Sequence, residues 1–383
     1  MNHQVRTFAT AILLTFAIDA GATILETERL ASIEKILVRH QAELGIPAIS
    51  IAIAIDGTIQ YSKAFGQTDL ENSIPATVDS RFRTASIAKS LTATAILQLV
   101  EKNLVDLDAD IREYCPAFPA KDHPIKVRQV LNHTSGIRHY QKRGESSGTE
   151  HFFTIADSLR IFKDDPLLIE PGSGFSYSTY NYSLLGCAIE NVSGLPYDLY
   201  MAKNIYSPAG MTHSGPDHQF IIIPGRARWY MALSEDEWEA LPAGAREQVS
   251  AGQVFNAALH DTSMKRAGGG LLSTARDLVR FAIAVMDGRL VKPETLAQMW
   301  SPQTTTTGEK VTSPWGDIGL GWMIRERDSR REIYTSGGQV GTRATMYIYP
   351  EDGIVLAIMC NLENAPIDPM LDEILVVLFA KAR

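Results

Sequence analysis

Segments with the residue pattern of β-strands stand near both ends of the chain, around a middle region that is richer in loops, prolines and helical patches. Apolar, β-branched runs at 49–55 and 58–64 flank Asp56-Gly57, which is a strong signal for a hairpin. Two more strand-like runs occupy 344–349 and 354–359. This arrangement predicts one sheet that is built from both termini, with an inserted helical region.

Three further segments carry helical patterns. Residues 26–44 have apolar residues at helical spacing with charges between them, which predicts an amphipathic helix. Residues 86–100 are low in charge, as expected of a buried helix, and another helix is predicted at 367–381. With 383 residues, of which 45% are hydrophobic, the chain can bury a sizeable core.

The N-terminus has the organisation of an export signal. Arg6 precedes an apolar run at 7–18, which is too short to span a bilayer comfortably, and Ala20-Gly21-Ala22 fits a cleavage site. We therefore expect residues 1–22 to be removed, and the chain to be periplasmic or secreted. The alternative is a buried or membrane-apposed N-terminal helix. No other stretch approaches the length of a transmembrane helix.

Composition disfavours several classes of function. The formal net charge is −8, so no general attraction to nucleic acid or to anionic membranes is expected. The three cysteines, Cys115, Cys187 and Cys360, form no zinc-binding pattern, and their odd number excludes complete pairing, so we expect buried thiols. The nine histidines include no His-Glu-x-x-His motif. We expect neither a metal nor another cofactor.

A Ser-x-x-Lys box at Ser86 and Lys89 is the first candidate for chemistry. Side chains at i and i+3 share one helix face, so Lys89 can reach Ser86, and a desolvated lysine loses its proton readily. If Ser86 opens the helix, its own N–H can stabilise an oxyanion. A second match, 32–35, lies in the charged amphipathic segment, and a Gly-x-Ser-x-Gly match at 144–148 has polar, loop-like flanks. We interpret both of these as structural.

A second box stands at Tyr177-Ser178-Thr179. With both boxes, the chain resembles the family of class C β-lactamases, D-alanyl-D-alanine carboxypeptidases and family-VIII esterases. Within this family it is most similar to the mitochondrial-type serine β-lactamase-like proteins. The stretches that carry the resemblance are 46–48, 65–66, 69–72, 86–89, 131–140 (LNHTSGIRHY), 171–186, 208–212 and 267–278 (AGGGLLSTARDL). The resemblance implies an α+β, β-lactamase/transpeptidase-like fold, in which N- and C-terminal segments form an antiparallel sheet flanked by helices. It also implies one hydrolase domain at 23–383. We expect 23–85 and 265–383 to form its α/β region and 86–264 its mainly helical region.

By resemblance, Tyr177 is the general base that acts beside Lys89. Physical chemistry agrees, because a nearby ammonium stabilises a phenolate that can accept the proton of serine. Thr179 stands where many members of the family have asparagine, and is expected to contact Lys89 or the substrate. His133, which with His139 could suggest a metal-binding pair, lies in the family's structural loop, and we expect it to be satisfied by hydrogen bonds.

The third box of the family, Lys-Thr-Gly or His-x-Gly, corresponds here to Thr335-Ser336-Gly337. The resemblance places these residues beside the substrate and pairs the N–H of Gly338 with that of Ser86 as the oxyanion hole. The cationic first residue is missing. Arg343 could supply a charge, although a surface arginine is the simpler interpretation.

The sequence therefore predicts a serine hydrolase that forms an acyl-enzyme on Ser86 and cleaves amide or ester bonds of a β-lactam, peptide or ester. One alternative is a carboxylesterase with little β-lactamase activity; another is a catalytically silent binding or structural protein on the same fold. A small molecule or peptide is the expected substrate, and the oligomeric state is left open. Segment 219–261 is expected to overlie the site.

Overall fold

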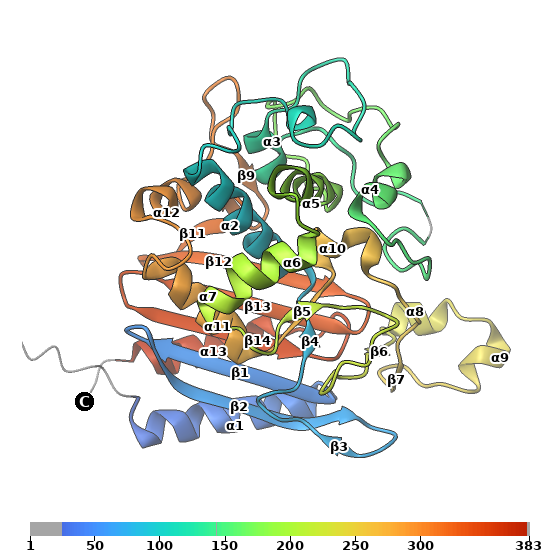
Figure 1. The fold of residues 1–383 in the computed structure, drawn as a ribbon. Coiled ribbons are helices and arrows are strands. Elements are labelled where there is room, and N and C mark those ends of the chain that lie inside the picture. The colour runs from blue at the N-terminus through green and yellow to red at the C-terminus, as the bar shows by residue number, and fades with distance from the viewer. Residues whose placement is uncertain (1–24, 143, 381–383) are drawn as a thin grey trace, which may run out of the picture.

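A nine-stranded sheet forms the centre of the computed structural model, which describes residues 25–142 and 144–380 (Figure 1). Every neighbouring pair of its strands is antiparallel. From one edge to the other, the strands are β3 (Ile74–Pro75), β2 (Thr58–Asp69), β1 (Ala48–Ile55), β14 (Ile354–Cys360), β13 (Thr342–Tyr349), β12 (Arg330–Gln339), β11 (Met323–Arg327), β10 (Gly316–Ile318) and β9 (Thr312–Ser313).

The two ends of the chain meet in the middle of this sheet, where β1 pairs with β14 in the register Ile49 to Cys360. The predicted sheet from both termini is thus confirmed. The predicted hairpin between β1 and β2 is also confirmed, and both turn residues have positive φ, 48° at Asp56 and 73° at Gly57. Two-residue hairpin turns require such angles, which Asp-Gly adopts at low cost.

Alternation along β1 explains how the sheet is covered on both faces. Ile49, Ile51 and Ile53 lie in one apolar cluster with residues of α1 (Thr27–Glu43) and α13 (Asp368–Phe379). Ala52 and Ala54 lie in the other cluster, together with α11 (Ala275–Met286). Because a strand directs alternate side chains to opposite faces, β1 is buried on both sides.

Most of the remaining helices lie above the second face of the sheet (Figure 1). They are α2 (Ala88–Glu101), α3 (Val127–Leu131), α4 (Ile155–Ser158), α5 (Tyr180–Ser193), α6 (Tyr197–Met201), α7 (Ser207–Ala209), α10 (Arg266–Gly269) and α12 (Pro293–Met299). A small sheet of β4 (Phe82–Arg83), β8 (Leu271–Ser273) and β5 (Gly215–Pro216) joins this region to the large sheet. No helix in the described ranges combines the length and apolarity needed to cross a bilayer. The predicted export signal lies outside the described residues.

A disulfide between Cys115 and Cys187 shows that the expectation of three buried thiols was wrong for two of them. The bond joins α5 to the segment that follows a short 3₁₀ helix (Ile111–Glu113), and 72 residues separate the two cysteines along the chain. A cross-link over a loop of this length stabilises the fold by about 4 kcal/mol in the chain-entropy description. Cys360 is a buried free thiol, as expected.

The segment 219–261 does not overlie the site. Its strands β6 (Tyr230–Ala232) and β7 (Val254–Asn256) carry the short helices α8 (Glu235–Glu239) and α9 (Ala243–Arg246) away from the body of the molecule (Figure 1). Neither helix has a buried residue. None of its residues lines the cavity described below, so this expectation was wrong.

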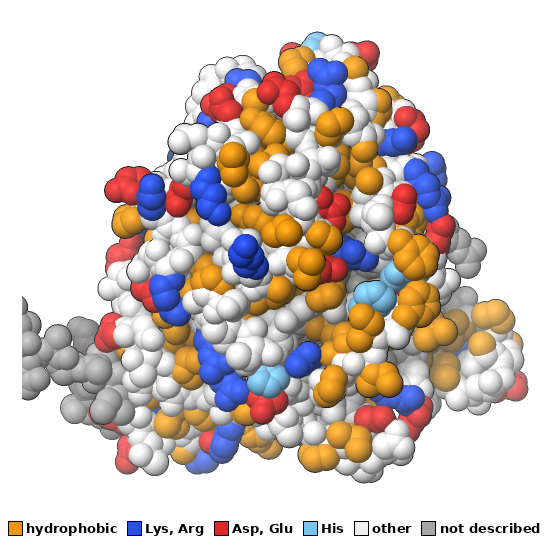
Figure 2. Space-filling view, in the orientation of Figure 1, with side chains coloured by type: hydrophobic (Ala, Val, Ile, Leu, Met, Phe, Trp, Pro, Cys, Tyr) orange, Lys and Arg blue, Asp and Glu red, His pale blue; other side chains and the backbone are white. Residues whose placement is uncertain are grey.

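Charged side chains of both signs are interspersed over the face seen in Figure 2. Among the described residues on that face, no broad basic surface of the kind that binds nucleic acid is present.

Candidate functional site

Ser86 lies in a one-turn 3₁₀ helix (Ala85–Ile87) that leads directly into α2. The preceding residue, Ala85, has a φ of 46°, which is unusual for a residue with a side chain. Strand β12 passes close to this turn: a Cβ atom on Gly337 would lie 2.6 Å from the backbone nitrogen of Ser86 and 2.6 Å from the carbonyl oxygen of Thr84. The glycine of the third box is therefore required for β12 to approach the serine.

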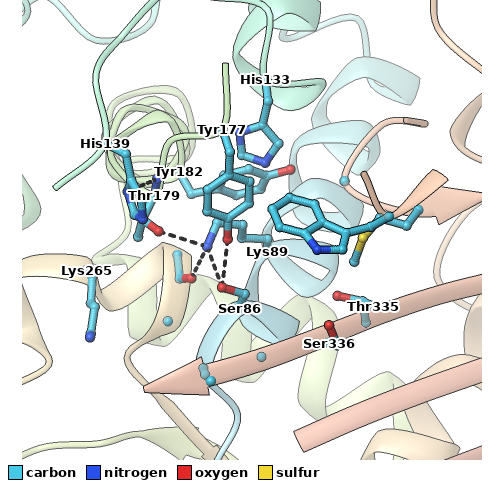
Figure 3. A pocket seen from close by; sticks show the side chains of 18 of the residues that line it. Ser86, Lys89, His133, His139, Tyr177, Thr179, Tyr182, Lys265, Thr335 and Ser336 are labelled. Carbon is cyan, nitrogen blue, oxygen red and sulfur yellow. Dashed lines mark hydrogen bonds between the residues drawn. The ribbon is translucent and has the colours of Figure 1, made fainter. Parts of the chain in front are cut away.

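Three side chains proposed from the sequence meet at one point (Figure 3). The Oγ of Ser86 is 2.8 Å from the Oη of Tyr177, and the Nζ of Lys89 donates to the same Oγ at 3.0 Å. Tyr177 comes from the loop before α5, 91 residues away from Ser86. The structure thus brings together the first two boxes.

Lys89 is held by acceptors on several sides. Its side chain is buried, and Nζ also donates to the Oγ1 of Thr179 at 3.2 Å and to the carbonyl oxygen of Gly268 at 2.7 Å. An ammonium has three donors, so these two bonds and the one to Ser86 use all of them. Thr179 therefore takes the expected contact with Lys89 despite its short side chain.

The electrostatics of the cluster favour proton transfer. Burial lowers the pKa of Lys89, an effect that the neighbouring Tyr177 opposes. Burial by itself raises the pKa of Tyr177, but the charge of Lys89, together with polar contacts to Lys89, Ser86 and Thr179, outweighs it and lowers that pKa below its usual value. Tyr182, in the same cavity, has a raised pKa because burial dominates there. Tyr177 is therefore distinguished as a proton acceptor by its partners.

Two neutral imidazoles fix the backbone that follows Tyr177. The Nδ1 of His133 accepts from the N–H of Ser178 at 3.2 Å, and the Nδ1 of His139 accepts from the N–H of Thr179 at 3.3 Å. Burial, followed by the charge of Lys89, lowers the pKa of both, to about 4 for His139. The expectation for His133 is confirmed. The described residues hold no group of three or more His, Cys, Asp or Glu side chains arranged to bind a metal.

The third box lies beside Ser86, on β12. Thr335, Ser336, Gly337 and Gly338 all line the cavity that Ser86 and Lys89 also line. Because residue 335 is a threonine, the third box has no positively charged side chain at its first position. Arg343, on β13 opposite Gly338, lines the same cavity, and 28% of its side chain is exposed. It faces Asp368 at 3.7 Å.

The cavity has a volume of about 310 Å³. Aromatic and apolar side chains, among them Phe175, Trp315 and Met323, form one part of its lining, and the ring of Trp315 packs against the rings of Phe175 and Tyr177. Lys265, a residue that sequence analysis missed, also lines the cavity, on the side of Ser86 opposite Thr335 (Figure 3). Its only signal in the sequence was its position two residues before the glycine-rich stretch 267–270.

Comparisons with known proteins find similar sequences over most of the chain. The family profile described as Beta-lactamase matches residues 33–380. The mitochondrial serine β-lactamase-like protein LACTB of Homo sapiens is 28% identical, over 86% of this chain and 76% of LACTB. Penicillin-binding protein 4* of Bacillus subtilis is 26% identical, over 82% of this chain and 68% of that protein.

Solved structures with the same fold include two at similar identity. The octameric penicillin-binding protein homologue from Pyrococcus abyssi has a TM-score of 0.76 and 25% identity, covering 92% of this chain and 78% of that one. The D-amino acid amidase from Ochrobactrum anthropi has a TM-score of 0.77 and 26% identity, covering 91% and 98%. The α+β, β-lactamase/transpeptidase-like fold expected from the sequence is thereby confirmed.

Proposed function

We propose that this chain, which belongs to the β-lactamase family, is a serine hydrolase that forms an acyl-enzyme on Ser86. The observation that carries the proposal is the position of Ser86 Oγ, within hydrogen-bond distance of both Tyr177 and Lys89. In the acylation step, the Tyr177 phenolate accepts the proton of Ser86 while Oγ attacks the carbonyl carbon of the substrate. The N–H groups of Ser86 and Gly338 stabilise the oxyanion.

The second half of the reaction uses the same groups. Tyr177 returns its proton to the leaving amine or alcohol, and an acyl-serine remains. Water then attacks the acyl carbon and gives up a proton to Tyr177. As the bond between the acyl carbon and Oγ breaks, Tyr177 passes this proton to Oγ, so the acid leaves and both the Ser86 hydroxyl and the Tyr177 phenolate are restored. The positive charge of Lys89 lowers the pKa of Tyr177 and so favours the phenolate between steps.

The substrate class is an amide or an ester. The names of two similar proteins, a penicillin-binding protein and a D-amino acid amidase, support an amide as the substrate. The direct test is turnover by the purified chain of a small ester, a cephalosporin and a D-alanyl peptide, together with labelling by a serine-directed phosphonate. Labelling on Ser86 with turnover of at least one substrate is expected. Absence of both would leave a silent binding protein on this fold.

A second candidate, an esterase with little β-lactamase activity, is favoured by the identity of Thr335. A lysine at this position would offer the carboxylate of a penicillin or cephalosporin a charge-assisted hydrogen bond, worth roughly 1.5–3 kcal/mol. A threonine hydroxyl can also donate to that carboxylate, but it carries no positive charge and adds no ion-pair attraction. This attraction is roughly 1 kcal/mol at about 4 Å in bulk water and larger in a partly buried site, so its absence corresponds to a several-fold or greater loss in acylation.

We therefore expect Thr335→Lys to raise kcat/KM for a cephalosporin several-fold, and by more than it raises kcat/KM for an uncharged ester. Thr335 lines the cavity, so the new ammonium can reach a bound carboxylate. The measurement is the ratio of the two kcat/KM values before and after substitution. A wild-type protein that already hydrolyses both substrates equally well, with no change in the variant, would show that another cation serves the carboxylate.

We also propose that the chain is exported. The disulfide Cys115–Cys187 supports this, because such bonds persist in oxidising compartments. Cleavage after Ala22 is expected to give a mature protein that begins at Thr23, which N-terminal sequencing of the exported protein can check. An intact Met1, or retention in the cytoplasm, would contradict the proposal.

A further inference from the structure

Lys265 is a buried cation that the proposed reaction does not use. It ends a short 3₁₀ helix (Ser263–Lys265) just before α10, and only 3% of its surface is exposed. It lines the same cavity as Ser86. Figure 3 places it on one side of Ser86, with Thr335 and Ser336 on the other.

The ammonium of Lys265 is poorly satisfied for a buried group. Its Nζ donates one hydrogen bond, to the carbonyl oxygen of Ser146 at 3.2 Å, and faces the ring of Tyr140 at 5.8 Å. Within residues 25–142 and 144–380, no carboxylate lies within salt-bridge distance of it. A buried ammonium has three donors, and leaving them without acceptors is costly.

The other charges of the cavity are already matched. Lys89 has three acceptors, and Arg343 faces Asp368. No Asp or Glu is found among the described residues that line the cavity. Asp217, whose charge acts on Lys265, is already bound to Arg83 at 2.7 Å. An anion that enters the cavity would therefore meet an unmatched positive charge and no repelling carboxylate.

We propose that Lys265 binds an anionic group of the substrate, a carboxylate, on the side of Ser86 opposite the third box. This inference rests on the proposed function and deepens it: the preferred substrates are esters or amides that carry a negative charge. The aromatic part of the lining at Phe175 and Trp315 would receive the apolar part of the same molecule. The carboxylate can belong to the acyl part or to the leaving group, and the experiment separates the two.

The charge state of Lys265 gives the preference a pH dependence. Burial, followed by the charges of Arg83 and Lys89, lowers the pKa of Lys265 to about 7. The charged and titratable groups that face it are Arg83, Lys89, Asp217, Glu363, His139, His260 and Tyr140. Lys265 is protonated below its pKa, so the preference for an anionic ester is present at pH 6 and is lost as the pH rises through about 7.

The test compares matched esters. The para-nitrophenyl monoester of succinic acid carries a carboxylate on its acyl part, and its methyl-capped diester is the neutral partner. An acetyl ester of a nitrophenol with a ring carboxylate carries the charge on the leaving group, and para-nitrophenyl acetate is its neutral partner. We expect the wild-type kcat/KM to favour at least one anionic ester by about tenfold or more. The ester pair that shows the preference identifies whether the carboxylate belongs to the acyl part or to the leaving group.

Lys265→Met is expected to remove this preference while changing kcat/KM for the neutral esters by less than about threefold. Lys203→Met, a lysine on the exposed surface, is the matched control and should leave the preference unchanged. In the wild type, the ratio of anionic to neutral kcat/KM should fall as pH rises from 6 to 9, whereas effects of Tyr177 and Lys89 cancel in that ratio. If the Lys265 variant does not fold, the pH dependence of this ratio in the wild type is itself the test.

Failure of this inference is distinguishable from failure of the proposed function. Equal ratios in wild type, Lys265→Met and Lys203→Met, with a flat pH profile, would overturn the role of Lys265 even though hydrolysis persists. If the wild type hydrolyses no ester, calorimetric binding of the succinate monoester to the wild type and to Lys265→Met decides the question. Binding about tenfold weaker in the variant supports the anion site, and equal or absent binding overturns it.

Discussion

Replacement of Ser86 by alanine is expected to lower kcat/KM by at least about 10³-fold and to abolish covalent labelling by a phosphonate, because no other group can form the acyl intermediate. Among the residues that the structure describes, the hydroxyl of Ser86 bonds only to Tyr177 and Lys89, so its removal leaves the core untouched. The thermal midpoint of Ser86→Ala should therefore stay close to that of the wild type. Hydrolysis of an activated ester and mass spectrometry of the labelled protein give the two readouts.

The chain supplies two matched controls for this substitution. Ser32 begins the other Ser-x-x-Lys match, and on the exposed surface of α1 its Oγ donates to the carbonyl oxygen of Glu28. Ser146 is exposed, and the bond that Lys265 makes to it uses the backbone carbonyl, which alanine keeps. Ser32→Ala and Ser146→Ala should both label and hydrolyse normally. A normal acyl adduct on Ser86→Ala would show that the nucleophile is another residue.

The fold was predictable wherever local pattern and turn chemistry agree. Asp56-Gly57 specifies a hairpin because both residues tolerate positive φ, and the alternation of isoleucine and alanine in β1 specifies a strand buried on two faces. The pairing of β1 with β14 is different, because it joins residues about 300 positions apart, as in Ile49 with Cys360. The distribution of strand-like runs suggested one sheet, but register and strand order come from packing.

The candidate site was most predictable where its residues lie close together in the sequence. Ser86 and Lys89 lie three residues apart, so helix geometry alone places them together. Tyr177 was found through resemblance, since nothing local indicates which tyrosine meets a serine 91 residues away. Lys265 was missed for the same reason: the burial and the missing partners that make it notable arise only when separate segments pack.

Errors in the sequence analysis share one physical origin. The disulfide Cys115–Cys187 depends on the approach of α5 to a segment 72 residues earlier, which three isolated cysteines do not reveal. The segment 219–261 was expected over the site, but β6 and β7 direct α8 and α9 outward. Both features depend on how separate segments are placed in the tertiary structure, which local residue pattern does not encode.

Substitution of Tyr177 by phenylalanine has the second-largest expected effect, a loss of about 10²–10⁴ in kcat/KM, the range typical of a removed general base. The ring and its contacts with His133 are retained, so the change removes only the hydroxyl that lies 2.8 Å from Ser86. Tyr182→Phe is the matched control. Its hydroxyl lies in the same cavity but donates to the carbonyl oxygen of Leu131 at 2.9 Å, and we expect less than about a threefold change in kcat/KM.

The pH profile separates a base from a residue that only positions the serine. A general base works in its deprotonated form, so wild-type kcat/KM should rise with pH as Tyr177 loses its proton. The pKa of Tyr177 is below its usual value, because the charge and hydrogen bonds around it outweigh the effect of burial, so this rise should begin at lower pH than for a free phenol. In Tyr177→Phe the remaining activity should lack that limb. If the variant keeps the same limb with near wild-type kcat/KM, the proton goes to Lys89 instead, whose pKa burial also lowers.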